Sequence, residues 1–487
     1  MWQILKNSFR AVFSYGQWIT IKKTIDHIHL QLIKLLFVSR LFFLGFNLAS
    51  QLKSKKHLNF KTLRKSLSQC FSLIKDKRQQ SKCDYSQHDA LMSAFACMFF
   101  QDPSLLHFQK RLEQKHQRNN LKNIFDVTNI PSNNQLRDII DNIESDALSP
   151  IFKDFHEKLR RHKHLESYAI LPNVLMCTID GTQYHSSKTV HCACCLTKTH
   201  KSGEITYSHG VLQGAIMHPD KKQVIPMMPE AIKNTDGTKK QDCEINAAKR
   251  FITRLNIAHP KQKFMICGDG LMSHQPMIEE TLRAGNHYLF VAKPGDHKYL
   301  VEWLDAFNVL PSTEFVDVKG NTHIYTWQNN VPLNGNEKTI NVNWFQYQFK
   351  NVKGKITKTH SWVSDIEITL SNVEKMSQAG RCRWKIENEC FNTLKNQGYH
   401  LEHNYGHGEN NLSYNMYLLT LLAFTFHQIF ELTDGVYQAC RVSFGSKAHL
   451  WENLRSTIRM VIVEDWAQLM DLMLNPDDYE VMKLKKS

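Results

Sequence analysis

The pattern of hydrophobic and polar positions changes twice along the chain, from helical to strand-like and back to helical. Residues 61–165 are helical in character, and we expect helices at Lys61–Asp76, Ser86–Phe100, Ser104–Gln117 and Ser132–Ile143. Three residues are candidate N-caps, because their side-chain oxygens can accept hydrogen bonds from the first turn of a helix: Asp84, Ser86 and Ser132.

From Leu171 short apolar runs replace the helical pattern. Val174–Ile179 is apolar and partly β-branched, and lies between Pro172 and Gly181, which predicts a strand buried on both faces. Further strands are expected at Ser208–Met217, Gln223–Met228, Lys263–Cys267 and His287–Ala292, with helices at Gln241–Leu255 and Gln275–Ala284. This alternation predicts a mixed α/β sheet flanked by helices.

Residues 296–365 differ from their surroundings. Strands are expected at Phe315–Val318, His323–Thr326, Ile340–Phe349 and Lys355–Val363, separated by turns that contain glycine and asparagine. We interpret this segment as a small antiparallel insertion within the α/β domain. Helical character returns from Asn372, and Asn415–Leu432 is apolar enough to be a helix of the core.

The charge of the chain is concentrated at its beginning. Of the 487 residues, 1–82 hold 16 Lys and Arg against two acids, whereas the remainder hold 45 Lys and Arg against 44 acids. A basic block of this kind usually neutralises phosphate, on nucleic acid or on a lipid surface. Residues 1–60 are therefore open to three interpretations: an amphipathic helix on a membrane surface, a DNA-binding extension, or sequence outside the working domain.

Cysteine usage and hydropathy favour a cytoplasmic protein. The twelve cysteines are mostly scattered singly in apolar segments, as reduced core cysteines are. The most apolar stretch, Leu30–Ala49, is interrupted by polar and basic residues and is a weak candidate for a membrane span. The N-terminus shows no signal-peptide pattern. We expect no stable membrane partner.

Acidic residues follow two of the predicted strands. Asp180 is expected where its strand ends, with Gly181 turning the chain away, and Asp269 lies between Gly268 and Gly270 after Lys263–Cys267. Asp180 alone could simply begin a turn. On neighbouring strands, however, the two carboxylates would lie close enough to share a divalent metal, for which carboxylates are suitable hard ligands.

A third carboxylate lies in Arg-Trp-Lys-Ile-Glu-Asn-Glu (383–389). On a helix Arg383 and Glu387 are four residues apart, so they share a face and can pair. Trp384 and Phe391 are seven apart on an adjacent face, which favours packing in the core. Glu389 is a second-choice carboxylate, about 200° around the helix from Glu387, so the two cannot serve one site.

A cysteine-rich segment offers a different metal chemistry. Cys192 and Cys195 have Cys-x-x-Cys spacing, which suits half of a structural zinc site that His200 or His209 would complete. Because no second Cys-x-x-Cys follows, a reduced thiol cluster in a loop is the favoured interpretation and zinc is the alternative. A zinc deaminase is excluded, since its Pro-Cys-x-x-Cys motif is absent.

Three motifs occur in a familiar order: Thr-Ile-Asp-Gly-Thr (178–182), Cys-Gly-Asp-Gly (267–270) and the 383–389 segment. Together they resemble the DDE transposases of bacterial insertion sequences, in particular the group with a β-rich insertion between the second Asp and the Glu. The likeness covers about residues 84–450. It includes Asp-Gly-Thr-Gln-Tyr (180–184) and Gly-Tyr-His-Leu-Glu-His-Asn-Tyr-Gly-His-Gly (398–408), which are similar to recurring patterns of that group.

The resemblance implies a fold, a reaction and a location. It implies an RNase-H-like catalytic domain with the triad Asp180, Asp269 and Glu387, which would hold two Mg²⁺ or Mn²⁺ ions, and with Arg383 contacting phosphate or holding Glu387. It implies cleavage of transposon ends and their joining to target DNA by a homodimer on double-stranded DNA, in the bacterial cytoplasm at the nucleoid. Candidate DNA contacts are Lys395, Trp384, Lys61, Arg64 and Lys65.

The same resemblance suggests a division of the chain. We expect a basic and hydrophobic extension at 1–60, an all-α DNA-binding domain at 61–165, a catalytic core at 166–295 and 366–432, a β-rich insertion at 296–365, and a C-terminal helical region at 433–487.

Two positions depart from the family signature. Where the signature has Tyr this chain has Gly380, and where it has Lys this chain has Leu394. Lys395 comes one place later, about 80° from the Glu387 face of a regular helix. Three rival interpretations therefore stay open. One is a nuclease that cuts without joining, another is a decayed transposase that only binds DNA, and the third is a membrane-surface protein led by residues 1–50.

Overall fold

The computed structural model describes residues 57–112, 115–234, 242–403 and 405–479. Residues 57–487 form one compact unit. The stretch Leu30–Ala49 and nearly all of the basic extension 1–60, on which the membrane and DNA-binding interpretations depend, lie outside the described residues.

Helices open the described part of the chain, as the pattern of residues 61–165 predicts. They are α3 (Phe60–Leu73), α4 (Gln87–Phe99), α5 (Leu105–Leu112), α6 (Lys115–Phe125), α7 (Asn133–Asp141) and α8 (Ser149–Arg161). Ser86 caps α4, and Ser132 forms a capping box with Gln135 at the start of α7. Asp84 does not cap α4, because that helix begins one residue after Ser86.

Strands and helices then alternate, and the expected mixed α/β sheet flanked by helices is confirmed. The strands are β1 (Ala169–Leu171), β2 (Val174–Ser187), β3 (Leu196–Thr199), β4 (Ile205–Ile216), β5 (Ile225–Pro226), β6 (Glu230–Ile232), β7 (Lys263–Gly268), β8 (His287–Val291), β9 (Ser312–Val316), β10 (Thr322–Pro332), β11 (Asn341–Lys350) and β12 (Ile356–Ser364). The sheet runs β3-β4-β2-β7-β8-β12-β11-β10-β9, with β1 beside β2, and β5 and β6 beside β4. Strands β2, β7 and β8 are mutually parallel.

The β-rich segment extends this sheet. Strand β12 pairs antiparallel with β8, with Trp362 opposite Val291, and β11, β10 and β9 follow in order. The four strands at 312–364 were expected as an antiparallel insertion, and they are antiparallel to one another. They are nevertheless continuous with β8, so the insertion is joined to the α/β sheet by backbone hydrogen bonds.

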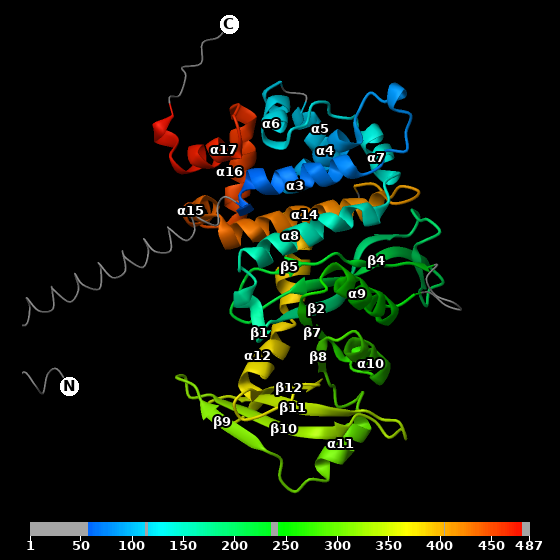
Figure 1. Cartoon of the computed structure of the whole chain (residues 1–487), viewed down its shortest axis with the longest axis vertical. Coiled ribbons are helices and arrows are strands. Elements are labelled where there is room, and N and C mark those ends of the chain that lie inside the picture. Colours follow the sequence, from blue (N-terminus) through cyan, green and yellow to red (C-terminus); the bar gives the residue numbers. More distant parts are fainter. Residues whose placement is uncertain (1–56, 113–114, 235–241, 404, 480–487) are drawn as a thin grey trace, which may run out of the picture. The chain divides into compact units, whose positions relative to one another are not determined.

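Helices cover the sheet and close the chain. They are α9 (Glu244–Ala258), α10 (Gln275–Arg283), α11 (Lys298–Asp305), α12 (Val373–Cys382), α13 (Asn392–Asn396), α14 (Leu412–Thr433), α15 (Gly435–Ser443), α16 (Lys447–Met460) and α17 (Trp466–Leu474). Between α12 and α13 the chain forms one π-helical segment, η6 (Ile386–Phe391). Figure 1 shows α14 lying between α3 and the strands.

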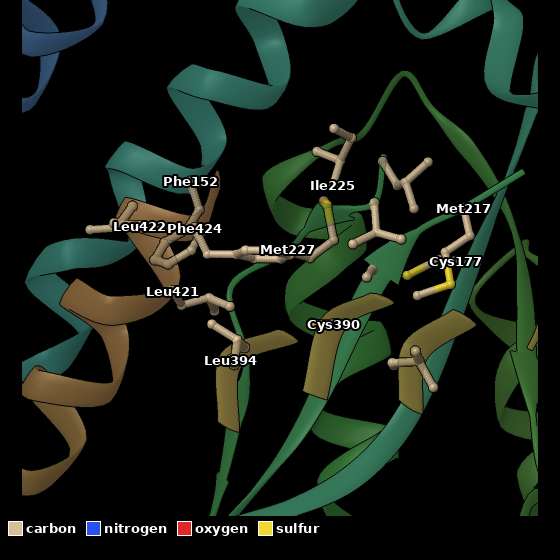
Figure 2. Close-up of a cluster of buried hydrophobic side chains, with 14 of the residues drawn as sticks. Phe152, Cys177, Met217, Ile225, Met227, Cys390, Leu394, Leu421, Leu422 and Phe424 are labelled. Carbon is tan, nitrogen blue, oxygen red and sulfur yellow. The ribbon is translucent and has the colours of Figure 1, made fainter. Parts of the chain in front are cut away.

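Helix α14 is the centre of the core, as its composition predicts. Among the described residues it is the one helix long and apolar enough to cross a membrane, but 89% of its most apolar window is buried inside the protein. It packs against α4, α7 and β5. In Figure 2, Leu421, Leu422 and Phe424 of α14 gather with Phe152 of α8, and the cluster continues to Cys177 of β2. The N-terminal helices and the sheet therefore share one hydrophobic core.

Candidate active site

Asp180 and Asp269 lie level with each other on neighbouring parallel strands. Strands β2 and β7 are paired up to Thr178 opposite Cys267, and each aspartate comes two residues later. Asp180 does not end its strand as expected, because β2 continues to Ser187 and Asp180 pairs with Gln213 of β4. Asp269 does follow the end of β7, where its carboxylate accepts a 3.0 Å hydrogen bond from the backbone N–H of Leu271.

Arg383 links the third carboxylate to the first. Its Nη2 donates to Glu387 Oε1 at 2.9 Å, so the expected pairing of these residues is confirmed. Its Nη1 donates to Asp180 Oδ2 at 3.1 Å. Glu387 lies on the π-helical segment η6 and not on a regular α-helix. Such π segments are rare and occur often at functional sites.

The charges of the site favour a bound cation. Burial raises the pKa of Asp180, and the nearby negative charges of Asp269 and Glu387 raise it further, while Arg383 opposes both effects. The pKa of Arg383 is raised, because the attraction of Asp180 and Glu387 outweighs the effect of burial. Arg383 thus pairs with two of the three carboxylates, and a divalent ion would relieve the repulsion between them and Asp269.

A fourth carboxylate, Glu244, belongs to this group, although we did not predict it from the sequence. Glu244 is the first residue of α9, and its Oε1 lies 2.2 Å from the position that a Cβ on Gly181 would take. Burial raises the pKa of Glu244, as do the charges of Asp180 and Asp269. Gly181 therefore provides space for Glu244 instead of turning the chain. An acidic residue in the first turn of a helix normally interacts favourably with the helix dipole, so the position of Glu244 in the sequence did not indicate a role in the site.

Gly181→Ala tests whether this fourth carboxylate matters. The new Cβ would push the flexible end of Glu244 aside, so we expect Mn²⁺ to bind about 10–100-fold more weakly while the folded state persists. Glu244→Gln should weaken Mn²⁺ binding in the same way. Titration calorimetry with Mn²⁺ measures both. Gly210→Ala in β4 is the matched control, since its nearest neighbour would be at 3.5 Å, and unchanged affinity in Gly181→Ala would contradict the assignment.

The structure accounts for both departures from the transposase signature. A Cβ on Gly380 would lie 2.4 Å from Cε2 of Trp362, a buried ring of β12, so no tyrosine fits at this position. Leu394 is fully buried in the core, where a lysine would be costly. Lys395 pairs with Glu402 at 2.9 Å. The departures therefore follow from packing around Trp362 and Leu394.

Gly380→Ala separates packing from helix propensity. In an exposed helix this change would stabilise by about 0.5–1 kcal/mol. Here the Cβ would overlap the Trp362 ring, and overpacking of a core costs about 1–3 kcal/mol, so we expect net destabilisation. Urea unfolding measures the difference. Gly295→Ala, where a Cβ would meet nothing within 4 Å, should leave stability nearly unchanged. A more stable Gly380→Ala variant would disprove this explanation.

The remaining candidate DNA contacts, Trp384 and three basic residues of α3, differ in how exposed they are. Trp384 was expected to pack in the core, but it is 58% exposed, whereas Phe391 is buried as expected. The regular helix assumed for this face is interrupted by η6, which changes the faces that residues around it present. On α3, Lys61 and Lys65 are exposed, and Arg64 forms a 3.1 Å ion pair with Asp126.

The cysteine-rich segment gathers three of its four predicted metal ligands. Cys192, Cys195 and His209 lie together, but His200 does not join them, because its Nε2 lies 2.8 Å from the hydroxyl of Thr206. The fourth member of the group is His407, from the segment before α14. Proximity along the chain favoured His200, and no local pattern pointed to His407.

Comparison with protein-family models gives no match for this chain, and comparison with curated proteins gives none either. The chemistry of the four carboxylates, Asp180, Asp269, Glu387 and Glu244, is therefore inferred from the residues themselves. Four partly buried acidic side chains provide oxygen atoms from β2, from the end of β7, from α9 and from η6. Mg²⁺ and Mn²⁺ prefer oxygen ligands of this type.

Proposed function

We propose that this chain is a DNA transposase of the DDE type with an RNase-H-like catalytic domain. It would bind the ends of its insertion sequence, cleave them and join them to target DNA. One observation carries the proposal: Asp180 and Asp269 lie level on adjacent strands, and Arg383 ties Glu387 to the same group. The order of the three motifs and the mixed sheet flanked by helices support it.

The residues divide the chemistry between them. Asp180, Asp269 and Glu387 would hold two Mg²⁺ or Mn²⁺ ions, which supply an activated water or DNA 3′-hydroxyl and stabilise the leaving oxygen of an in-line displacement. Strand β2 fixes Asp180 in place, and the hydrogen bond from Leu271 restrains Asp269. Arg383 holds two of the carboxylates in position and is charged at every pH of interest, so it also suits a phosphate contact.

DNA binding is assigned to the basic N-terminal part of the chain. We propose that residues 61–165 are an all-α DNA-binding region in which the exposed Lys61 and Lys65 contact phosphate. Exposed Trp384, three residues from Glu387, is available to stack on a base near the reacting end. Two copies would act together on paired double-stranded ends in the cytoplasm, as the resemblance implies.

The test uses purified full-length protein, Mn²⁺ and a supercoiled plasmid that carries the ends of the element. We expect cleavage at the ends and a joined product in which those ends are linked to target DNA. Cleavage without any joined product would replace the proposal with a nuclease. Binding of the ends without cleavage in either metal would replace it with a DNA-binding protein that has lost its activity.

A further inference from the structure

A second group of side chains, separate in chemistry from the carboxylates, has the residue types and spacing to hold a metal ion. We propose that it binds one structural Zn²⁺ ion. The group, here called the Cys2His2 cluster, consists of Cys192, Cys195, His209 and His407. Its four ligand atoms all lie within 4.8 Å of one another. Two thiolates and two imidazoles in a tetrahedral arrangement are typical of structural zinc.

The distances within the cluster match a zinc tetrahedron. Bonds of 2.3 Å to sulfur and about 2.0–2.1 Å to nitrogen place tetrahedral ligands about 3.8 Å apart for two sulfurs, 3.6 Å for sulfur and nitrogen, and 3.3 Å for two nitrogens. The two sulfurs are 3.9 Å apart, and the nitrogens of His209 and His407 are 3.0 Å apart. The sulfur–nitrogen distances are 3.5 Å from Cys192 to His209, 3.3 Å from Cys195 to His209 and 3.5 Å from Cys195 to His407.

A disulfide does not explain the cluster. Bonded sulfurs are about 2.05 Å apart, whereas those of Cys192 and Cys195 are separated by 3.9 Å and both cysteines are free. Both sulfurs face the Nε2 of His209, and that of Cys195 also faces the Nε2 of His407. The four ligand atoms thus point toward a common centre that a metal ion would occupy.

His407 is held in the orientation that a zinc ligand needs. Its Nδ1 lies 2.8 Å from the backbone carbonyl oxygen of Gly408 and donates a hydrogen bond to it, which leaves the Nε2 lone pair directed at the cluster. The flanking Gly406 and Gly408 both have positive φ, at 129° and 70°. Such a backbone favours glycine, so the turn around His407 is specified by its neighbours.

The segment that carries His407 is also anchored from the other side. The carboxylate of Asp141 accepts hydrogen bonds from the backbone N–H groups of Glu409, Asn410, Asn411 and Leu412. A Cβ on Gly408 would lie only 2.3 Å from Asp141 Oδ1, so Gly408 allows this close approach. The position of His407 therefore does not depend on the cluster alone.

The cluster joins parts of the chain that are far apart in sequence. Cys192 and Cys195 follow strand β2, which carries Asp180, and His209 lies on β4 opposite His185 of β2. His407 follows the segment of Glu387 and precedes α14. Four protein ligands leave no open position, so the ion would be structural and would tie the β2–β4 hairpin to the 398–411 segment. This inference does not depend on transposase activity.

The test is the metal content of full-length protein after dialysis against metal-free buffer, measured by mass spectrometry. We expect about one zinc per chain. His407→Ala and Cys195→Ser should each lower it at least about tenfold. Two neighbours outside the cluster serve as matched controls: His200→Ala and Cys194→Ser should keep their zinc. Asp180→Asn should also keep it, which separates this site from the carboxylates.

A second measurement uses the wild-type protein alone, so it tests the proposal even if the variants fail to fold. Wild-type protein stripped of metal and loaded with Co²⁺ should show the intense visible absorption of tetrahedral cobalt thiolate, and added Zn²⁺ should abolish it. Wild-type protein with less than about a tenth of a zinc per chain and no such spectrum would overturn the proposal. Zinc that is lost in His200→Ala but kept in His407→Ala would overturn the ligand set.

Discussion

Asp180→Asn, Asp269→Asn and Glu387→Gln are each expected to reduce metal-dependent cleavage of DNA ends about a thousandfold or more. Each change keeps the shape of the side chain and removes one negative charge from the metal ligands. The first two changes would remove a ligand held by strand β2 or by the end of β7, and the third would remove both the metal contact of Glu387 and its ion pair with Arg383. The effect should therefore appear in the rate of cleavage and in Mn²⁺ affinity.

The measurement compares single-turnover cleavage rates and Mn²⁺ titrations with those of a control on the same segment. Glu389→Gln is that control, because Glu389 lies two residues from Glu387 on η6 and is exposed. We expect it to cleave at nearly the wild-type rate. If Glu389→Gln lost cleavage while Glu387→Gln kept it, the third carboxylate would be Glu389. Circular dichroism should show all four variants folded.

The strands were predictable from sequence because their apolar runs are short and bounded. Val174–Ile179 and Lys263–Cys267 were placed at β2 and β7, and their carboxylates proved to be level. The predicted end of β2 was wrong, because Gly181 was interpreted as the residue at which the chain turns away. A glycine within a strand often marks a close approach of another group, here the Glu244 carboxylate. That contact joins residues 63 positions apart, and no local pattern reports it.

The helix near Glu387 shows a second limit of sequence reasoning. A regular α-helix was assumed over 383–395, and the faces of Trp384 and Lys395 were calculated from it. Instead, residues 383–384 form a turn and the π-helical segment η6 follows; Trp384 is exposed, and Lys395 pairs with Glu402. The Arg383–Glu387 pair was nevertheless predicted correctly.

The metal ligands show the same limit at longer range. Cys192, Cys195 and His209 were recognised from short spacings, but His200, the other histidine considered, lies outside the group. His407 is 212 residues from Cys195 and reaches the cluster only through the fold of the 398–411 segment. A single sequence contains the ligand types of such a site but not the contact that completes it.

The core around α14 has a consequence for how the chain unfolds. The ring centroids of Phe99 on α4 and Phe426 on α14 are 5.9 Å apart. The Phe99 ring also packs against Phe60 of α3 and Trp466 of α17. Helices from both ends of the described chain therefore pack on one phenylalanine. Because the N-terminal helices have no separate core, we expect residues 57–487 to unfold in one cooperative transition.

Phe99→Ala is expected to destabilise the protein by about 3–5 kcal/mol, because it removes a fully buried ring from tightly packed aromatic neighbours and leaves a cavity. Leu73→Ala on α3 is the control, since Leu73 is 85% exposed and its loss should cost less than about 0.5 kcal/mol. Urea unfolding followed by tryptophan fluorescence and circular dichroism measures both. Two separate transitions in the wild type, with Phe99→Ala shifting only one, would show that the N-terminal helices form an independent domain.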